Sequence, residues 1–93
     1  MATHTVNLSW TGVAGVDGYN VYRGTASGQE NTKLNSSLLI GTTYSDATAV
    51  AGDAFYVVRS SISGVESANS NEVNVVLVDP PAAPTSLTIT SHT

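Results

Sequence analysis

Phe55-Tyr-Val-Val-Arg-Ser60 is the strongest strand signal in the chain, because it is rich in aromatic and β-branched residues. Side chains alternate between the two faces of a strand, and burying an unpaired charge is costly, so Arg59 is expected to face outward. Phe55 and Val57 then share the outer face with Arg59. The residues left facing the core are Tyr56, Val58 and Ser60.

Two further strands are predicted upstream, separated by a segment rich in glycine. Val6, Leu8 and Trp10 alternate with polar residues over 5–10, which indicates a half-buried strand. A second strand is predicted over 19–23. Its expected inward residues are Tyr19 and Val21, and its expected outward residues are Asn20 and Tyr22.

The segments between these strands and the central stretch carry weaker signals. Residues 33–40 predict a short edge strand with a bend, because leucines and an isoleucine surround Asn-Ser-Ser. Residues 42–46 predict another short strand, with Tyr44 inward. The connection over 49–53 is expected to turn on Gly52, since glycine adopts positive φ without strain.

Downstream of the central stretch the pattern indicates a hairpin and one last strand. The turn is expected within 62–67, centred on Gly64, and the strand over 72–78. Apolar residues never recur with helical spacing over a helical length. Short strands at near-regular spacing therefore predict an all-β, antiparallel β-sandwich.

Length and composition are consistent with one small domain. A chain of 93 residues supports a single core, and the absence of cysteine means that packing alone must stabilise it. Charged residues make up 11% of the chain, while serine and threonine number twelve each and asparagine seven. These polar residues disfavour helices and suit strands and turns.

Charge and hydropathy exclude two classes of partner. The net charge of −4 repels a phosphate backbone, so nucleic acid is not expected to bind. No apolar run is long enough for membrane insertion, and the N-terminus lacks the pattern of a signal peptide. Because Met1-Ala2 looks like an expression start, we expect the natural N-terminus to lie further upstream in a larger protein.

The residues that could carry chemistry do not form a catalytic or metal-binding pattern. His4 and His92 lie near the two ends, with no oriented triad and no cysteine at zinc-ligand spacing. Four carboxylates could in principle assemble a calcium site from loops, but no Asp-x-Asp-x-Asp-Gly run is present. They are expected to be solvated turn residues: Asp46, Asp53, Glu66 and Glu72. We therefore expect no enzyme activity, no cofactor and no metal.

An ordered set of motifs along nearly the whole chain resembles the fibronectin type III domain. His4-Thr-Val-Asn-Leu-Ser-Trp10 and Val16-Asp-Gly-Tyr-Asn-Val-Tyr-Arg23 resemble strands B and C of that family. The later matches are Thr43-Tyr-Ser-Asp46, Ala51-Gly-Asp-Ala-Phe-Tyr-Val-Val58 and Gly64-Val-Glu-Ser-Ala-Asn-Ser-Asn-Glu-Val73. The resemblance implies an immunoglobulin-like sandwich. The compact bacterial variety occurs in secreted and cell-surface proteins and beside carbohydrate-active enzymes, which implies an extracellular or cell-surface location.

One departure from the family concerns the tyrosine at the start of strand F, which usually bonds back across a corner of the sandwich. Counting from Gly52 points to Phe55, which has no hydroxyl group. The facing argument points to Tyr56 instead. We take Tyr56 as the core residue and expect its hydrogen bond to differ from the usual corner bond.

A second departure concerns the order of the strands. The family opens with a proline-rich lead and strand A, whereas this pattern appears here at the far end, in 80–93. Ser91-His-Thr93 also nearly repeats Thr3-His-Thr5. We therefore expect residues 1–79 to form strands B to G, and 80–93 to be a linker plus strand A of a following repeat in a tandem array. A permuted domain is the alternative.

This arrangement predicts an exposed edge on strand B and a spare strand that could fill such an edge. Return of the spare strand within one molecule is difficult, because strand G ends at the pole opposite to where strand A begins. Leu87 and Ile89 are therefore expected to dock into a neighbouring repeat or another copy of the chain, as in donor-strand complementation.

Two functions are compatible with these features. The first is a structural spacer that positions adhesive or catalytic modules in a secreted bacterial protein. The second is an adhesion module that binds carbohydrate or protein through an outer face with aromatic residues, which can stack on sugars. The residues expected on that face are Asn20, Tyr22, Phe55, Val57 and Arg59. Packing against an adjacent repeat, or ordinary surface hydrophobicity, also accounts for this face and is the preferred interpretation, because isolated exposed apolar residues need no explanation.

Overall fold

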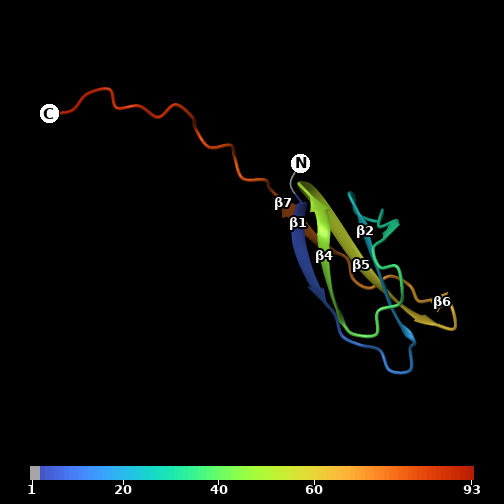
Figure 1. Ribbon diagram of the computed structural model, residues 1–93. Coiled ribbons are helices and arrows are strands. Elements are labelled where there is room, and N and C mark those ends of the chain that lie inside the picture. The colour runs from blue at the N-terminus through green and yellow to red at the C-terminus, as the bar shows by residue number, and fades with distance from the viewer. Residues whose placement is uncertain (1–2) are drawn as a thin grey trace.

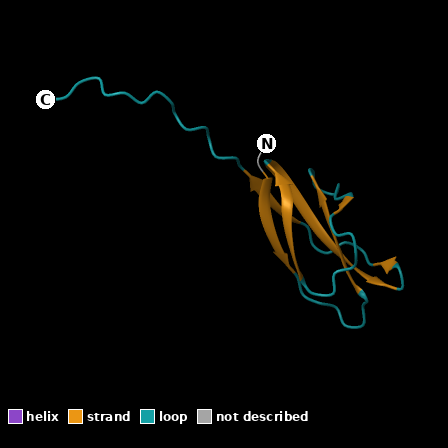
Figure 2. Cartoon of the chain, in the orientation of Figure 1, coloured by secondary structure: helices purple, strands orange, loops and turns teal. Residues whose placement is uncertain are grey.

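The computed structural model describes residues 3–93, which form strands and loops without any helix (Figure 2). The strands are β1 (Thr3–Ser9), β2 (Gly18–Gly24), β3 (Thr32–Lys33), β4 (Thr43–Val50), β5 (Gly52–Ile62), β6 (Val65–Glu66) and β7 (Val73–Leu77). The predicted all-β class is confirmed. None of the described residues forms a helix that is long and apolar enough to cross a membrane.

The strands form two antiparallel sheets that pack against each other (Figure 1). The first sheet pairs β1 with β4. The second has the order β3-β2-β5-β6, and β7 also pairs with β5. β6 pairs with residues 61–62 of β5, and β7 pairs with residues 52–56. The two short strands therefore pair with different segments of the same long strand.

The core lies between the two sheets and contains residues that the strand periodicity predicts to face inward. Val21, Ala54 and Tyr56 are its buried centre. The partly buried residues packed against them are Val6, Leu8, Trp10, Leu34, Leu39, Tyr44, Val58, Val75 and Leu77. The inward facing predicted for alternate residues of β1, β2 and β5 is therefore confirmed, as is that of Tyr44.

The edge strand predicted over 33–40 is wrong for most of its length. Only Thr32–Lys33 forms a strand, and Leu39 makes an isolated bridge with Tyr19. The reason is the buried side chain of Asn35, whose Oδ1 accepts a hydrogen bond from the backbone N–H of Val21 at 2.8 Å. A side chain thus takes the place of a backbone partner and prevents a continuous ladder.

The predicted hairpin is confirmed, and the strand predicted over 72–78 is present as β7, Val73–Leu77, with the short strand β6 as an addition before it. Ser63 and Gly64 both have positive φ, 48° and 80°, as a tight two-residue hairpin turn requires. The chain then pairs with β5 in two short strands, β6 and β7. Between them the hydroxyl groups of Ser67 and Ser70 accept hydrogen bonds from backbone N–H groups of β5 at 3.0 and 2.9 Å.

The C-terminal segment extends away from the sandwich (Figure 1). The last strand ends at Leu77, and residues 80–93 are exposed throughout. Leu87 is 98% exposed and Ile89 84% exposed. This segment gives the molecule its length, 75 Å against 23 and 20 Å in the other two directions.

Candidate ligand-binding face

The outer face of β2 and β5 holds the residues predicted to bind a ligand. The register places Asn20 opposite Arg59, Tyr22 opposite Val57 and Gly24 opposite Phe55. Since directly opposed residues point to the same side of a sheet, the five predicted residues share one face. The structure therefore brings them together as expected.

This face is nevertheless much less exposed than expected. Val57 is only 2% exposed and Asn20 only 7% exposed. Val57 points away from the core, but Phe55 and Arg59 flank it on the same face of the strand and Tyr22 lies opposite. Arg59 also places its guanidinium 4.3 Å from the centre of the Tyr22 ring. The side chains of this face therefore largely cover one another and leave little of the face open.

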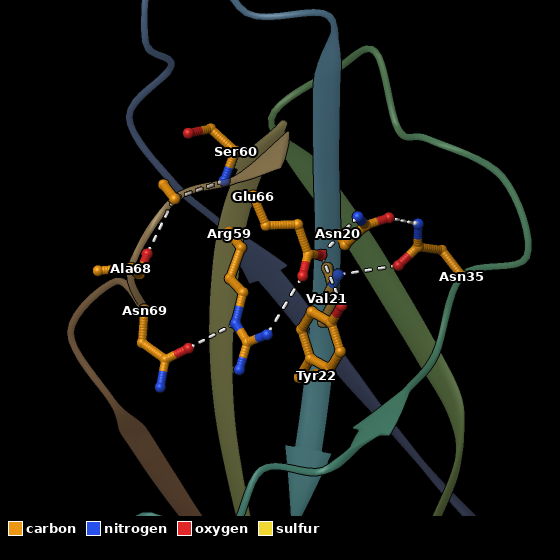
Figure 3. Close-up of polar contacts among 10 residues, drawn as sticks. Asn20, Val21, Tyr22, Asn35, Arg59, Ser60, Glu66, Ala68 and Asn69 are labelled. Atoms are coloured by element: carbon orange, nitrogen blue, oxygen red, sulfur yellow. Dashed lines mark hydrogen bonds and ion pairs between the residues drawn. The ribbon is translucent and has the colours of Figure 1, made fainter. Parts of the chain in front are cut away.

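Glu66 is the centre of the polar contacts on this face (Figure 3). It accepts hydrogen bonds from the Tyr22 hydroxyl group at 2.5 Å and from the Asn20 amide at 2.8 Å. It also forms an ion pair with Arg59 at 3.2 Å. The Arg59 Nε–H donates to Asn69 at 2.7 Å. We call Asn20, Tyr22, Arg59, Glu66 and Asn69 the Glu66 network.

Sequence reasoning missed Glu66 and Asn69 as members of this face. A local signal for Glu66 was present, because the tight turn at 63–64 pairs Glu66 with Ser61. Ser61 lies two residues beyond Arg59, on the same face of β5. Counting across the hairpin would thus have placed the carboxylate near the arginine. Asn69 lies in the irregular stretch between β6 and β7, where no such count applies.

The electrostatics of the Glu66 network keep its groups bound to one another. Hydrogen bonds, first from Tyr22 and then from Asn20 and Arg59, hold the pKa of Glu66 below its ordinary value despite partial burial. Burial and the Glu66 carboxylate raise the pKa of Tyr22. At neutral pH the network is therefore a neutral tyrosine, a carboxylate and a guanidinium that satisfy each other.

The carboxylate with the most buried position is Asp46, which was expected to be solvated. It is 1% exposed, and its oxygens lie 2.7 Å from Arg23 Nη1 and 2.7 Å from the Tyr56 hydroxyl group. Thr48 donates to it through both the backbone N–H and the hydroxyl group. Asp46 thereby links β4 of one sheet to β2 and β5 of the other.

The expectation for Tyr56 is confirmed. It is a core residue, 2% exposed, and its hydroxyl group donates to a side chain, that of Asp46, instead of making the usual corner bond. Burial, together with the Asp46 carboxylate, raises the pKa of Tyr56. The tyrosine therefore stays neutral and remains a hydrogen-bond donor.

The other candidate residues lie apart. Asp53 is exposed on β5, and Glu72 accepts hydrogen bonds from the Ser27 hydroxyl group and the Gly28 backbone. His4 Nε2 lies 2.7 Å from Asp79 Oδ1. Within residues 3–93, no three His, Cys, Asp or Glu side chains come together as a metal site.

Acidification is expected to destabilise the fold through Asp46 and Glu66. Burial raises the pKa of Asp46, but hydrogen bonds from Thr48, Tyr56 and Arg23 outweigh burial and leave that pKa below its ordinary value. Both carboxylates thus bind protons more readily in the unfolded chain. Their stabilisation is present above the ordinary pKa values of 3.8 and 4.5 and is lost as the pH falls through the lower values of the folded state.

Urea denaturation at about pH 7 and about pH 3 tests this expectation. The midpoint should be lower at the acidic pH, and a Glu66→Gln variant should lose less stability between the two. Equal midpoints for the unmodified chain would contradict the assignment.

The chain is similar to proteins of two bacteria. No protein-family model matches the chain. A solved structure, described as a Fn3-like protein from Clostridium thermocellum, superposes with a TM-score of 0.69 and 33% sequence identity, over 84% of this chain and 81% of that chain. The amylopullulanase of Thermoanaerobacterium saccharolyticum is 33% identical over 79 residues, which are 85% of this chain and 6% of the amylopullulanase.

Proposed function

The chain belongs to the fibronectin type III-like family. We propose that it is a non-catalytic spacer repeat of a larger secreted or cell-surface bacterial protein. The similarity to a segment that is 6% of an amylopullulanase supports a role as one small module among others. A spacer needs a stable sandwich and no open site.

The observation that carries this proposal is that the polar groups of the Glu66 network are already bonded to one another. A sugar-binding face offers an uncovered aromatic ring and free polar groups. Here one side of the Tyr22 ring is covered by Arg59, and the Tyr22 hydroxyl group is engaged by Glu66. A ligand would have to displace contacts that already satisfy these groups.

A binding module remains the second candidate because of one feature beside the network. A shallow hollow of about 410 Å³ lies next to Tyr22 and Glu66 and is lined largely by polar residues, including Lys33, Ser36 and Ser37. Hydroxyl and ammonium groups can donate hydrogen bonds to a carbohydrate. This hollow favours carbohydrate over an apolar protein partner as the ligand of the second candidate.

Affinity electrophoresis in gels containing pullulan, starch or cellulose derivatives separates the two candidates. For a spacer we expect the mobility of the chain to be the same with and without polysaccharide. Retardation that is lost in Tyr22→Ala but kept in Tyr22→Phe, which retains the ring, would overturn the spacer proposal in favour of the binding module. Circular dichroism of both variants controls for folding.

A further inference from the structure

The two sides of the sandwich, where the edges of the two sheets face each other, differ in how far contacts bridge the sheets. On the β4 side, Arg23 reaches across to Asp46, and the Tyr44 hydroxyl group donates to the Leu34 carbonyl at 3.3 Å. On the β1 side, β1 and β7 do not pair, and a hollow of about 370 Å³ lies between them. The lining of this hollow includes Leu8, Trp10, Tyr56, Val58, Ser70 and Val73.

The edge of β1 that borders this hollow has unused hydrogen-bonding groups. Among the described strands, β1 pairs only with β4. The backbone N–H of Trp10 donates to the carbonyl oxygen of Thr42 at 3.0 Å. In an antiparallel ladder, residues whose backbone groups bond to the partner strand alternate with residues whose backbone groups point away from it. The backbone groups of Asn7 and Ser9 therefore point to the free edge. The indole N–H of Trp10 is also buried without an acceptor. An added strand would satisfy the backbone groups of Asn7 and Ser9 at this edge.

The C-terminal segment has the properties of such a strand. Residues 80–93 contain no Asp, Glu, Lys or Arg. Leu87 and Ile89 alternate with Thr88 and Thr90, so an extended conformation presents one apolar and one hydroxyl-bearing face. Both apolar side chains are almost fully exposed in the single chain, where nothing covers them.

The direction of the chain argues that this strand serves another copy. His4, near the start of β1, contacts Asp79, so the segment leaves the sandwich at that end. The hollow lies at the opposite end of β1, around Leu8 to Thr11. An antiparallel strand would have to begin there and run towards His4, against the direction in which the segment leaves. Three prolines in 80–84 also stiffen the connection and disfavour a reversal.

We propose that residues 87–90 of one copy add to the free edge of β1 in a second copy, with Leu87 and Ile89 in the hollow against Leu8 and Trp10. Thr88 and Thr90 then face solvent. A reciprocal exchange closes a dimer, and a head-to-tail exchange makes a longer assembly. This inference goes beyond the spacer role and can fail without affecting it, since a spacer repeat can also be monomeric.

Light scattering coupled to size-exclusion chromatography tests the exchange on the 93-residue chain. At increasing concentration the mass should rise from 9.5 kDa to twice that value or more. The double variant L87D/I89D should stay at the monomer mass, because it places charge in the hollow. The matched control T88D/T90D carries the same charges on the solvent face and should associate like the unmodified chain.

Fluorescence gives a second readout, because Trp10 is the single tryptophan of the chain and lines the hollow. Its emission should shift to shorter wavelength on association, in the unmodified chain and in T88D/T90D but not in L87D/I89D. A monomer at every concentration, equal loss of association in both double variants, or association without a change in tryptophan emission would each overturn the proposal.

Discussion

Replacement of Asp46 with alanine is expected to lower the free energy of unfolding by about 3–5 kcal/mol, the usual result of removing one partner from a buried ion pair. Asp46 is 1% exposed and accepts hydrogen bonds from Arg23, Thr48 and Tyr56. Without the carboxylate, the Tyr56 hydroxyl group is left buried and unpaired, and the guanidinium of Arg23 loses its counter-charge.

Urea denaturation followed by circular dichroism measures this loss. Asp53→Ala is the matched control, because Asp53 is exposed on the neighbouring strand β5. The control should change stability by no more than about 0.5 kcal/mol. A loss below about 1 kcal/mol in Asp46→Ala would mean that the carboxylate is solvated, as the sequence first suggested.

Tyr56→Ala is expected to destabilise the chain by a similar amount, about 3–5 kcal/mol. Tyr56 is 2% exposed, and its ring packs in the centre of the core with Val21 and Ala54. The substitution leaves a cavity between the sheets and also removes the hydrogen bond to Asp46. Thermal unfolding followed by differential scanning calorimetry would show a markedly lower Tm.

Tyr56→Phe separates the two contributions. It keeps the ring and removes only the hydrogen bond to a charged group, so it should cost about 1.5–3 kcal/mol. Equal losses in the phenylalanine and alanine variants would contradict the assignment of the ring to the core. A negligible loss in Tyr56→Phe would contradict the hydrogen bond to Asp46.

The contacts of Asp46 and those of the Glu66 network lie in different parts of the fold. Asp46 joins the two sheets through the interior, whereas Glu66 joins the β6 hairpin to the outer face of β2 and β5. Both groups of contacts engage side chains that would otherwise be free to bind a ligand. This is the physical basis for proposing a spacer, and it leaves the free edge of β1 as the surface best suited to assembly.

Strand positions and facing could be predicted from the sequence because they depend on local alternation. The residues Val6, Leu8 and Tyr56 face inward simply because every second residue of a strand does so. The hairpin at Gly64 followed from the backbone freedom of glycine. The bend after Lys33 could not be located in the same way, because it depends on the side chain of Asn35 reaching β2.

The all-β class, the two faces of the main strands and the apolar pattern of Leu87 and Ile89 could all be derived from local sequence, since each is a property of neighbouring residues. The burial of Asp46, the covering of Val57 and the contacts of Glu66 with Tyr22 and Arg59 became visible only once the strands were placed in space. These features depend on which strands meet across the sandwich and across a turn. The burial of a charge in particular depends on partners far along the chain, because a carboxylate leaves water only where donors have already been assembled for it.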